Sequence, residues 1–123
     1  MDLDEIFPGS HRRITAWAKL HGFCWYCKDD WALQTHHIQR RSSCYRNWGD
    51  VELNLFRTCP GCHETKVDAM SHAEQLAYKA FYDPDTFNLG AWLHCRDGPF
   101  LKAPERVTME EVIEAAERFG FGL

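Results

Sequence analysis

The sequence lacks any long apolar run, and its first residues lack the pattern of a signal peptide. Its apolar stretches are far shorter than the ~18 residues that a membrane-spanning helix needs, so we expect no membrane span. The acidic first residues, Met1 to Glu5, do not have the basic and apolar pattern of a secretory signal peptide. We therefore expect a cytoplasmic protein.

Repeats and low-complexity segments are also missing, which excludes solenoid and fibrous architectures. Apolar residues make up 45% and aromatic residues 14% of the 123 residues, as in a globular chain with a modest core. At this length we expect a single domain over residues 1–123.

Positive charge is not in excess, because the formal net charge is −4. The charge is unevenly distributed: residues 1–66 hold 9 Lys/Arg and 8 Asp/Glu, whereas residues 67–123 hold 5 and 10. The acidic second half could contact a partner protein. A local basic patch can still bind nucleic acid on an acidic chain. The candidate residues for such a patch are Arg40, Arg41, Arg46, Arg57 and Lys66. The alternative is that they are ordinary solvated side chains.

Cysteine spacing is the most informative feature of the composition. Four of the six cysteines form two pairs with two residues inside each, namely Cys24 with Cys27 and Cys59 with Cys62. In a cytosolic chain such pairs indicate a structural Zn²⁺ site with four thiolate ligands rather than disulfides. The 31 residues between the pairs exceed the spacing of a short zinc ribbon, so a further element is inserted. Cys44 and Cys95 stand alone and are expected to be small buried side chains.

Turn and capping residues divide the first part of the chain into short elements. Ser10 and Gly22 suit the two ends of a helix over 10–21. Alternating side chains predict a strand over 32–38, a polar loop follows at 39–50, and residues 52–57 could form a second short strand. Pro60 suits the first position of a helix over 60–70.

The second part of the chain is expected to add helices. Ser71 with Glu74, and Thr108 with Glu111, form capping-box patterns that open helices to about 82 and to Gly120. Residues 86–107 are expected to be irregular because they contain several Gly and Pro residues. The side chains expected to face inward from the last helix are Val112, Ile113, Ala116 and Phe119.

The segment between the cysteine pairs carries groups that a phosphodiesterase needs. His36 and His37 are adjacent on the first strand, Asn54 lies on the second, and His63 directly follows Cys62. A histidine can deprotonate water near neutral pH, and a cation stabilises charge on the scissile phosphate. Because neighbouring strand residues point to opposite sides, the two strand histidines have different roles, one toward a metal and one toward the attacking water.

These motifs together resemble the HNH endonuclease family over roughly residues 12–70. The 16 residues between His37 and Asn54, and the 8 between Asn54 and His63, are similar to the family's spacing. The resemblance implies an α+β fold with a ββα-metal, treble-clef-like core at about 22–70, a structural zinc, an N-terminal helix at 10–21 and a helical extension at 71–123.

The resemblance also implies roles for individual residues. His37 would be the general base, His36 and His63 would bind a catalytic divalent ion (Mg²⁺, Mn²⁺, Ni²⁺ or Zn²⁺), and Asn54 would organise the loop and orient His37. Arg40 or Arg41 could clamp the phosphate. The implied activity is hydrolysis of DNA to 3′-hydroxyl and 5′-phosphate ends, by nicking or double-strand cleavage. Small members of the family resemble phage, mobile-element and restriction proteins, so the host would be a bacterial or phage-infected cell.

Other interpretations compete with this one. The cysteines would be equally present in a catalytically silent zinc module that binds nucleic acid or protein. Asn47 is a rival to Asn54, and His94 is expected to be a packed core residue. Trp17, Trp25 and Trp31 lie close to the cysteines in sequence and are expected to pack in the core rather than to stack on bases.

Overall fold

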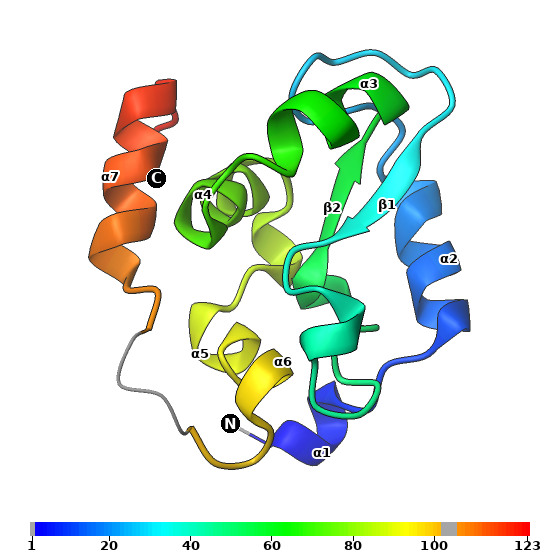
Figure 1. Cartoon of the computed structure of the whole chain (residues 1–123), viewed down its shortest axis with the longest axis vertical. Helices are drawn as coiled ribbons and strands as arrows, with labels where there is room; N and C mark the ends of the chain where they lie inside the picture. Colours follow the sequence, from blue (N-terminus) through cyan, green and yellow to red (C-terminus); the bar gives the residue numbers. More distant parts are fainter. Residues whose placement is uncertain (1, 102–105) are drawn as a thin grey trace.

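The computed structural model describes residues 2–101 and 106–123, and its architecture is mixed α+β around one antiparallel hairpin (Figure 1). Strand β1 (Gln34–His37) pairs with strand β2 (Leu55–Thr58) in a two-stranded sheet. The register places His36 opposite Phe56 and His37 opposite Leu55. The mixed α+β class expected from the sequence is confirmed.

Both strands are shorter than the sequence pattern predicted. Ala32 has a φ of 50°, outside the extended region, so β1 begins two residues later than expected. Residues Glu52–Asn54 form a 3-10 turn rather than the start of β2. The predicted loop at 39–50 contains one 3-10 turn, Arg41–Ser43.

The helices beside the hairpin begin where their caps predict. Helix α2 (His11–Leu20) starts after Ser10, whose hydroxyl accepts a hydrogen bond from the Arg13 N–H. Pro60 occupies the first position of α3 (Pro60–Cys62). The predicted α-helix to residue 70 is wrong beyond this point, because the chain continues as a π-helical turn, η3 (His63–Val67).

The capping box at Ser71 is confirmed, and Thr108 caps the last helix by accepting the Glu111 N–H. At the start of α4 (His72–Tyr82), the Ser71 hydroxyl and the Glu74 carboxylate each accept the other residue's N–H. Helix α7 (Met109–Phe119) starts at Thr108 and ends at Gly120, which has a left-handed φ of 79°. The inward face of α7 is formed by Val112, Ala115 and Ala116, with Phe119 partly buried.

Two predictions for this half are wrong. Ile113 is 39% exposed, because it lies one residue off the inward stripe of α7 and Ala115 takes the inward position. The segment 86–107 was expected to be irregular but contains α5 (Leu89–Trp92) and α6 (His94–Asp97). The Asn88 side chain caps α5 by accepting the Ala91 N–H. Residues 102–105 of that segment are outside the described part.

The helices enclose the hairpin from two sides (Figure 1). Helix α2 lies along one side, and α4 packs against β2 on the other, with α7 against the outer side of α4. Helices α5 and α6 lie beyond the end of the hairpin where β2 begins, near the short helix α1 (Leu3–Ile6). No helix in the described ranges is long and apolar enough to span a bilayer.

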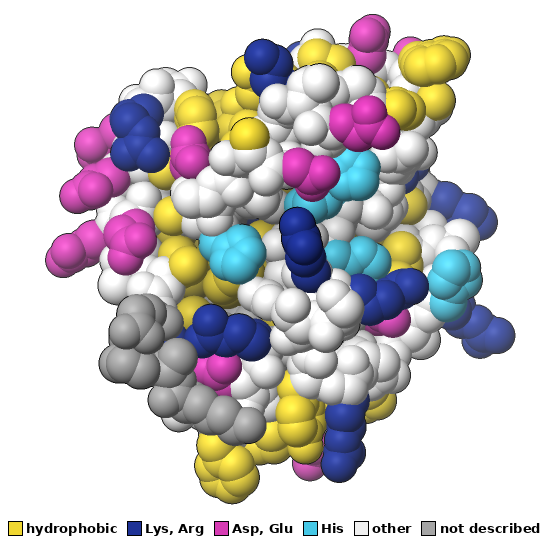
Figure 2. Space-filling view, in the orientation of Figure 1, with side chains coloured by type: hydrophobic (Ala, Val, Ile, Leu, Met, Phe, Trp, Pro, Cys, Tyr) yellow, Lys and Arg dark blue, Asp and Glu magenta, His cyan; other side chains and the backbone are white. Residues whose placement is uncertain are grey.

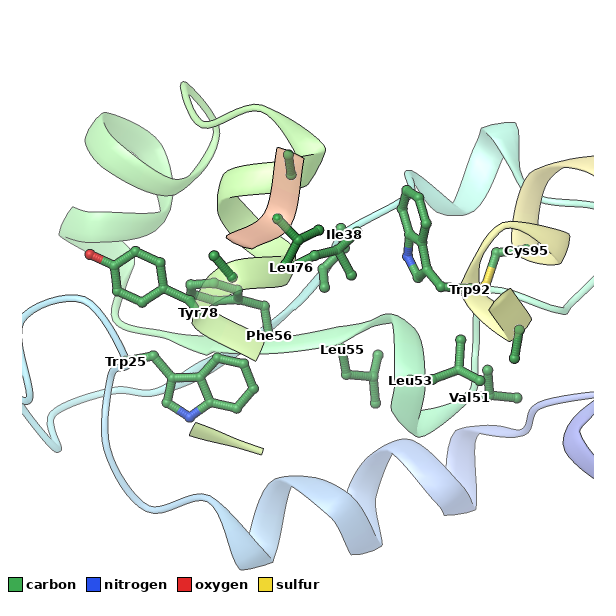
Figure 3. Packing of buried hydrophobic residues seen from close by; sticks show 14 of the residues in the cluster. Trp25, Ile38, Val51, Leu53, Leu55, Phe56, Leu76, Tyr78, Trp92 and Cys95 are labelled. Atoms are coloured by element: carbon green, nitrogen blue, oxygen red, sulfur yellow. The ribbon is translucent and has the colours of Figure 1, made fainter. Parts of the chain in front are cut away.

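The core fills the space between these elements (Figure 3). Phe56 of β2 and Leu76 of α4 are fully buried, and Trp25 packs on Phe56 with a ring-centroid distance of 4.8 Å. Trp17 is buried as expected, but the expectation for Trp31 is wrong, since it is 73% exposed. It lies on the loop before β1, where positive φ values at Lys28 and Ala32 turn the chain away from the core.

The two single cysteines differ in burial. Cys95 of α6 is fully buried, as expected. Cys44 is only half-buried, and its thiol donates to the Arg40 carbonyl at 3.2 Å. Burial raises the pKa of Cys44 to about 11, so its thiol is protonated at neutral pH.

A buried ion pair on α4 binds the start of β2 and the turn before it. The Lys79 ammonium of α4 donates to the carbonyls of Glu52 and Leu55 at 2.6 and 3.0 Å, and to the Asp83 carboxylate at 2.7 Å. Burial lowers the pKa of Lys79 to about 8, although Asp83 opposes this shift. The Trp17 indole N–H donates to the same carboxylate at 2.8 Å. One side chain therefore joins α4 to both ends of the Glu52–Leu55 segment.

Replacing Lys79 tests this support. Lys79→Met leaves the buried Asp83 carboxylate without its lysine and two carbonyls without this donor, so we expect the free energy of unfolding to fall by about 3–5 kcal/mol. Lys19→Met removes an exposed lysine and should change it by less than about 0.5 kcal/mol. Urea unfolding of the zinc-loaded variants measures both. A loss below about 1 kcal/mol in Lys79→Met would contradict a structural role for the pair.

Candidate functional site

Four cysteines from distant parts of the sequence meet at one point. Cys24 and Cys27 lie on the turn between α2 and β1, whereas Cys59 directly follows β2 and Cys62 lies in α3. Their sulfur atoms are all within 4.8 Å of one another. The Trp25 N–H donates to the Arg57 carbonyl at 3.0 Å, which fastens the turn to β2. The predicted convergence of the two cysteine pairs is confirmed.

The geometry and chemistry of this cluster fit a structural zinc. The Sγ atoms of Cys27 and Cys59 are 3.7 Å apart, close to the roughly 3.8 Å edge of a tetrahedron with ~2.3 Å Zn–S bonds. Burial opposes ionisation of Cys24, but backbone N–H groups of Cys27, Cys59 and Tyr26 lower its pKa to about 6. Burial and the neighbouring thiols raise the pKa of Cys62. Four thiolates in this space require a cation, and Zn²⁺ is the one that prefers this donor set.

A second cluster of potential ligands joins β1 to the π-helical turn that follows α3. The Nδ1 atom of His36 is 3.0 Å from the Nε2 atom of His63, and the Oδ1 atom of Asp68 is 3.8 and 3.5 Å from these two nitrogens. All three atoms could ligate the same metal ion. Two imidazoles and one carboxylate form a mixed donor set suited to a small divalent transition metal or Mg²⁺.

Neighbouring amides contact the two histidines. Gln75 of α4 donates its amide N–H groups to the Val67 and Met70 carbonyls, at 3.2 and 3.1 Å, so its oxygen faces the His36 Nε2 atom at 2.8 Å. An amide oxygen only accepts, so that nitrogen carries the proton and the Nδ1 lone pair faces His63. Burial is the main reason why the pKa of His36 is below its usual value. His36 is thereby held in the neutral form that a metal ligand needs.

A second amide contacts His63. The exposed Gln34 side chain places its amide oxygen 2.9 Å from the His63 Nδ1 atom. The His63 Nε2 atom faces the His36 Nδ1 atom at 3.0 Å. These two nitrogens and the Asp68 carboxylate oxygen could ligate one cation.

The sequence pattern did not reveal Asp68. Residues three and four apart face each other on an α-helix, which would place Lys66 or Val67 beside His63. The π-helical turn instead bonds the Asp68 N–H to the His63 carbonyl at 3.1 Å and brings Asp68 over His63. Gln34 and Gln75 were missed as well, because amides that orient a ligand have no spacing rule in the sequence.

His37 is the last residue of β1 and lines the same hollow as His36. Its Nε2 atom is 2.9 Å from the Oδ1 atom of Asp50, which also accepts from the Arg41 Nε–H at 3.0 Å. The hollow is an open pocket of about 660 Å³, lined by Thr35, His36, His37, Arg40, Arg41, Ser42, His63 and Asp68. Figure 2 shows histidine side chains gathered on this face, with Lys or Arg side chains between and beside them.

Asn54 is fully buried and is not part of the pocket lining. Its amide donates to the Gln39 and Gly49 carbonyls at 3.1 Å each, and its oxygen accepts from the Gln39 N–H and the Trp92 indole, both at 2.8 Å. Asn54 therefore fixes both ends of the loop between the strands. Within the described residues, its hydrogen bonds go to the loop and to Trp92 and not to His37. The rival Asn47 donates to the Gly9 carbonyl at 2.9 Å, away from the pocket lining.

The candidate basic residues separate into two groups. Arg40 and Arg41 line the pocket. Arg57 instead donates to the His21 carbonyl at 2.9 Å and to the Thr35 hydroxyl at 3.1 Å, because it lies on the hairpin face toward α2. The Arg46 guanidinium stacks over the Tyr45 ring at 5.2 Å, and Lys66 is exposed on η3. Neither of these lines the pocket.

His94 lies outside the pocket on α6. It is half-buried, and its Nδ1 atom is 2.5 Å from the Gly98 carbonyl, so it closes the end of that helix. It is not among the potential metal ligands in the described ranges.

Comparisons with known proteins found no family model, no curated protein and no solved structure that matches this chain.

The cysteine cluster gives a direct test of the zinc site. We expect one tightly bound Zn²⁺ per chain, and Cys59→Ser should lose the metal and most of the folded core, since structural zinc contributes directly to folding. Cys44→Ser, outside the cluster, should retain both. Elemental analysis and circular dichroism measure zinc content and folding. A soluble, folded and zinc-free Cys59→Ser protein would show that the cluster does not hold a structural metal.

Proposed function

We propose that this protein is a metal-dependent DNA endonuclease of the HNH type. The observation that carries the proposal is the meeting of three metal-binding side chains, His36, His63 and Asp68, beside His37 in one open pocket. The order of hairpin, zinc-binding cysteines and helix supports a ββα-metal core for the region between Cys24 and Asp68.

The protein would hold a divalent cation with His36, His63 and Asp68. Bound there, Mg²⁺, Mn²⁺, Ni²⁺ or Zn²⁺ supplies Lewis-acid stabilisation of the charge that develops on the phosphate and the leaving oxygen. The residues of the chain prepare the site, because Gln75 fixes the His36 ring with its Nδ1 lone pair directed inward and Gln34 contacts the outer nitrogen of His63. Asp68 adds a negative charge that increases affinity for a cation.

His37 would act as general base on the opposite side of the pocket. In the proposed step His37 takes a proton from water, the water oxygen forms a new bond to phosphorus, and the bond from phosphorus to O3′ breaks. The electron pair of that bond remains on O3′, which takes a proton from solvent. The products are a 3′-hydroxyl and a 5′-phosphate. Histidine is the side chain that most often takes this role in enzymes.

DNA is proposed as the substrate because Arg40 and Arg41 face the pocket beside the metal ligands. Guanidinium groups donate to phosphate in a fixed fork and are well suited to the DNA backbone. The small hairpin reaches a scissile phosphate most easily where the minor groove is widened or bent. A phage, mobile-element or restriction role in the cytoplasm of a bacterial or infected cell, and a protein partner for the acidic second half, belong to the same proposal.

A plasmid-nicking assay with Mg²⁺, Mn²⁺ or Ni²⁺ tests the function. His37→Ala should reduce the rate by ~10²–10⁴-fold, the usual contribution of a general base, while Mn²⁺ binding measured by calorimetry stays nearly intact. His63→Ala should lower metal affinity and rate together, and a higher metal concentration should restore part of the rate.

The fold should survive both changes, because the cysteine cluster uses other residues. Full activity in His37→Ala would refute the proposed mechanism. Absence of cleavage by the wild-type protein with every metal would favour the alternative of a silent zinc module that binds nucleic acid or protein.

The arginines give a separate test of the substrate. Replacing Arg40 and Arg41 together by Ala should flatten the dependence of log affinity on log salt by ~1–2 units, at ~0.9 per lost phosphate contact. Arg57→Ala, on the other side of the hairpin, should leave this slope unchanged. Fluorescence anisotropy over a salt series measures both. An unchanged slope in the double variant would place the DNA path on another surface.

A further inference from the structure

The loop that Asn54 fixes brings one carboxylate to His37. The Oδ1 atom of Asp50 lies 2.9 Å from the His37 Nε2 atom and 3.0 Å from both the Nε and Nη2 atoms of Arg41. Asp50 and His37 are mostly buried, with side chains 16% and 17% exposed, whereas Arg41 is 59% exposed. The carboxylate therefore lies behind the pocket and contacts one residue proposed for catalysis and one proposed for phosphate binding.

The backbone of Asp50 is held in place from two directions. Its N–H donates to the Asn47 carbonyl at 3.1 Å, and its carbonyl accepts from the Ser10 N–H at 3.1 Å. Gly9 approaches so closely that a Cβ atom there would lie 2.0 Å from the Asp50 carbonyl oxygen. Asn54 adds a bond to the Gly49 carbonyl at 3.1 Å, directly before Asp50. A carboxylate anchored in this way can define the direction of the ring that it contacts.

The contacts of Asp50 determine which nitrogen of His37 carries the proton. A guanidinium only donates, so the Oδ1 atom that receives two Arg41 nitrogens is an acceptor. The His37 Nε2 atom must then be a donor, and the neutral ring is the Nε2–H tautomer. Its Nδ1 atom has no hydrogen-bond partner within the described residues, and His37 lines the open pocket. The free lone pair of His37 is therefore on Nδ1.

We propose that Asp50 is a positioning residue that holds His37 as the Nε2–H tautomer, so that Nδ1 is the atom that takes the proton from the attacking water. This rests on the proposed nuclease function. When water gives its proton to Nδ1, the ring becomes an imidazolium and Asp50 compensates its charge. The water oxygen bonds to phosphorus, and the electron pair of the broken P–O3′ bond leaves on O3′, as above. The sequence predicted that Asn54 both organises the loop and orients His37. In this proposal Asn54 fixes the loop and Asp50 orients His37.

The tautomer can be measured without any activity. In long-range ¹H–¹⁵N spectra of zinc-loaded protein at pH 8, the wild-type His37 ring should show a protonated Nε2 and an unprotonated Nδ1. Asp50→Ala should remove this preference or move it toward Nδ1–H. Asp85→Asn, a change in an exposed carboxylate of the turn after α4, should leave the His37 signals as they are. Circular dichroism and zinc content should be unchanged in all three proteins.

Kinetics then separate positioning from general structural support. Asp50→Ala should lower kcat by ~10–100-fold, as for other residues that orient a reacting group through hydrogen bonds, with a smaller change in KM. In the His37→Ala background the same replacement should change the residual rate by less than ~3-fold, because Asp50 acts through His37. Asp50→Asn should retain part of the rate, since its amide oxygen can still accept from Nε2.

The outcomes are distinct. An equal loss from Asp50→Ala in both backgrounds, or a wild-type His37 with its proton on Nδ1, would overturn the inference. If the wild-type protein cleaves no DNA and the tautomer nevertheless depends on Asp50 as expected, the orienting role of Asp50 stands and the nuclease proposal fails.

Discussion

The arrangement of the pocket depends on the attachment of the Cys24–Cys27 turn to the end of β2 and the start of α3. The four sulfurs meet within 4.8 Å, so the turn, the end of β2 and the start of α3 are held together at one point. His63 follows Cys62 directly, so the position of the cysteines also fixes the position of a metal ligand. A structural zinc at this point would couple folding of the chain to assembly of the second cluster.

Buried polar groups support the rest of the hairpin. Lys79 donates hydrogen bonds to the carbonyls of Glu52 and Leu55, and Asn54 donates to both ends of the loop between the strands. Two short strands with few neighbours would be marginally stable alone. These satisfied internal bonds and the aromatic core hold the hairpin, so that the side chains around the open pocket keep their geometry.

The sequence predicted features that depend on neighbours along the chain. Caps such as Ser71 with Glu74 defined helix starts, and cysteine spacing predicted the cluster, because both depend on a few adjacent residues. Asp50 and Asp68 could not be predicted. The first depends on the path of a loop held by Gly9 and Asn54, and the second depends on a π-helical turn in place of an α-helix.

We propose that one hairpin carries a structural zinc and a separate cation site for cleaving DNA. Anomalous diffraction from crystals of the zinc-loaded protein soaked in Mn²⁺, recorded at the zinc and manganese edges, tests this arrangement. We expect a zinc peak among the four cysteine sulfurs and a manganese peak in contact with His36 Nδ1, His63 Nε2 and Asp68 Oδ1. A zinc peak with no manganese among these three residues, at millimolar Mn²⁺, would contradict it.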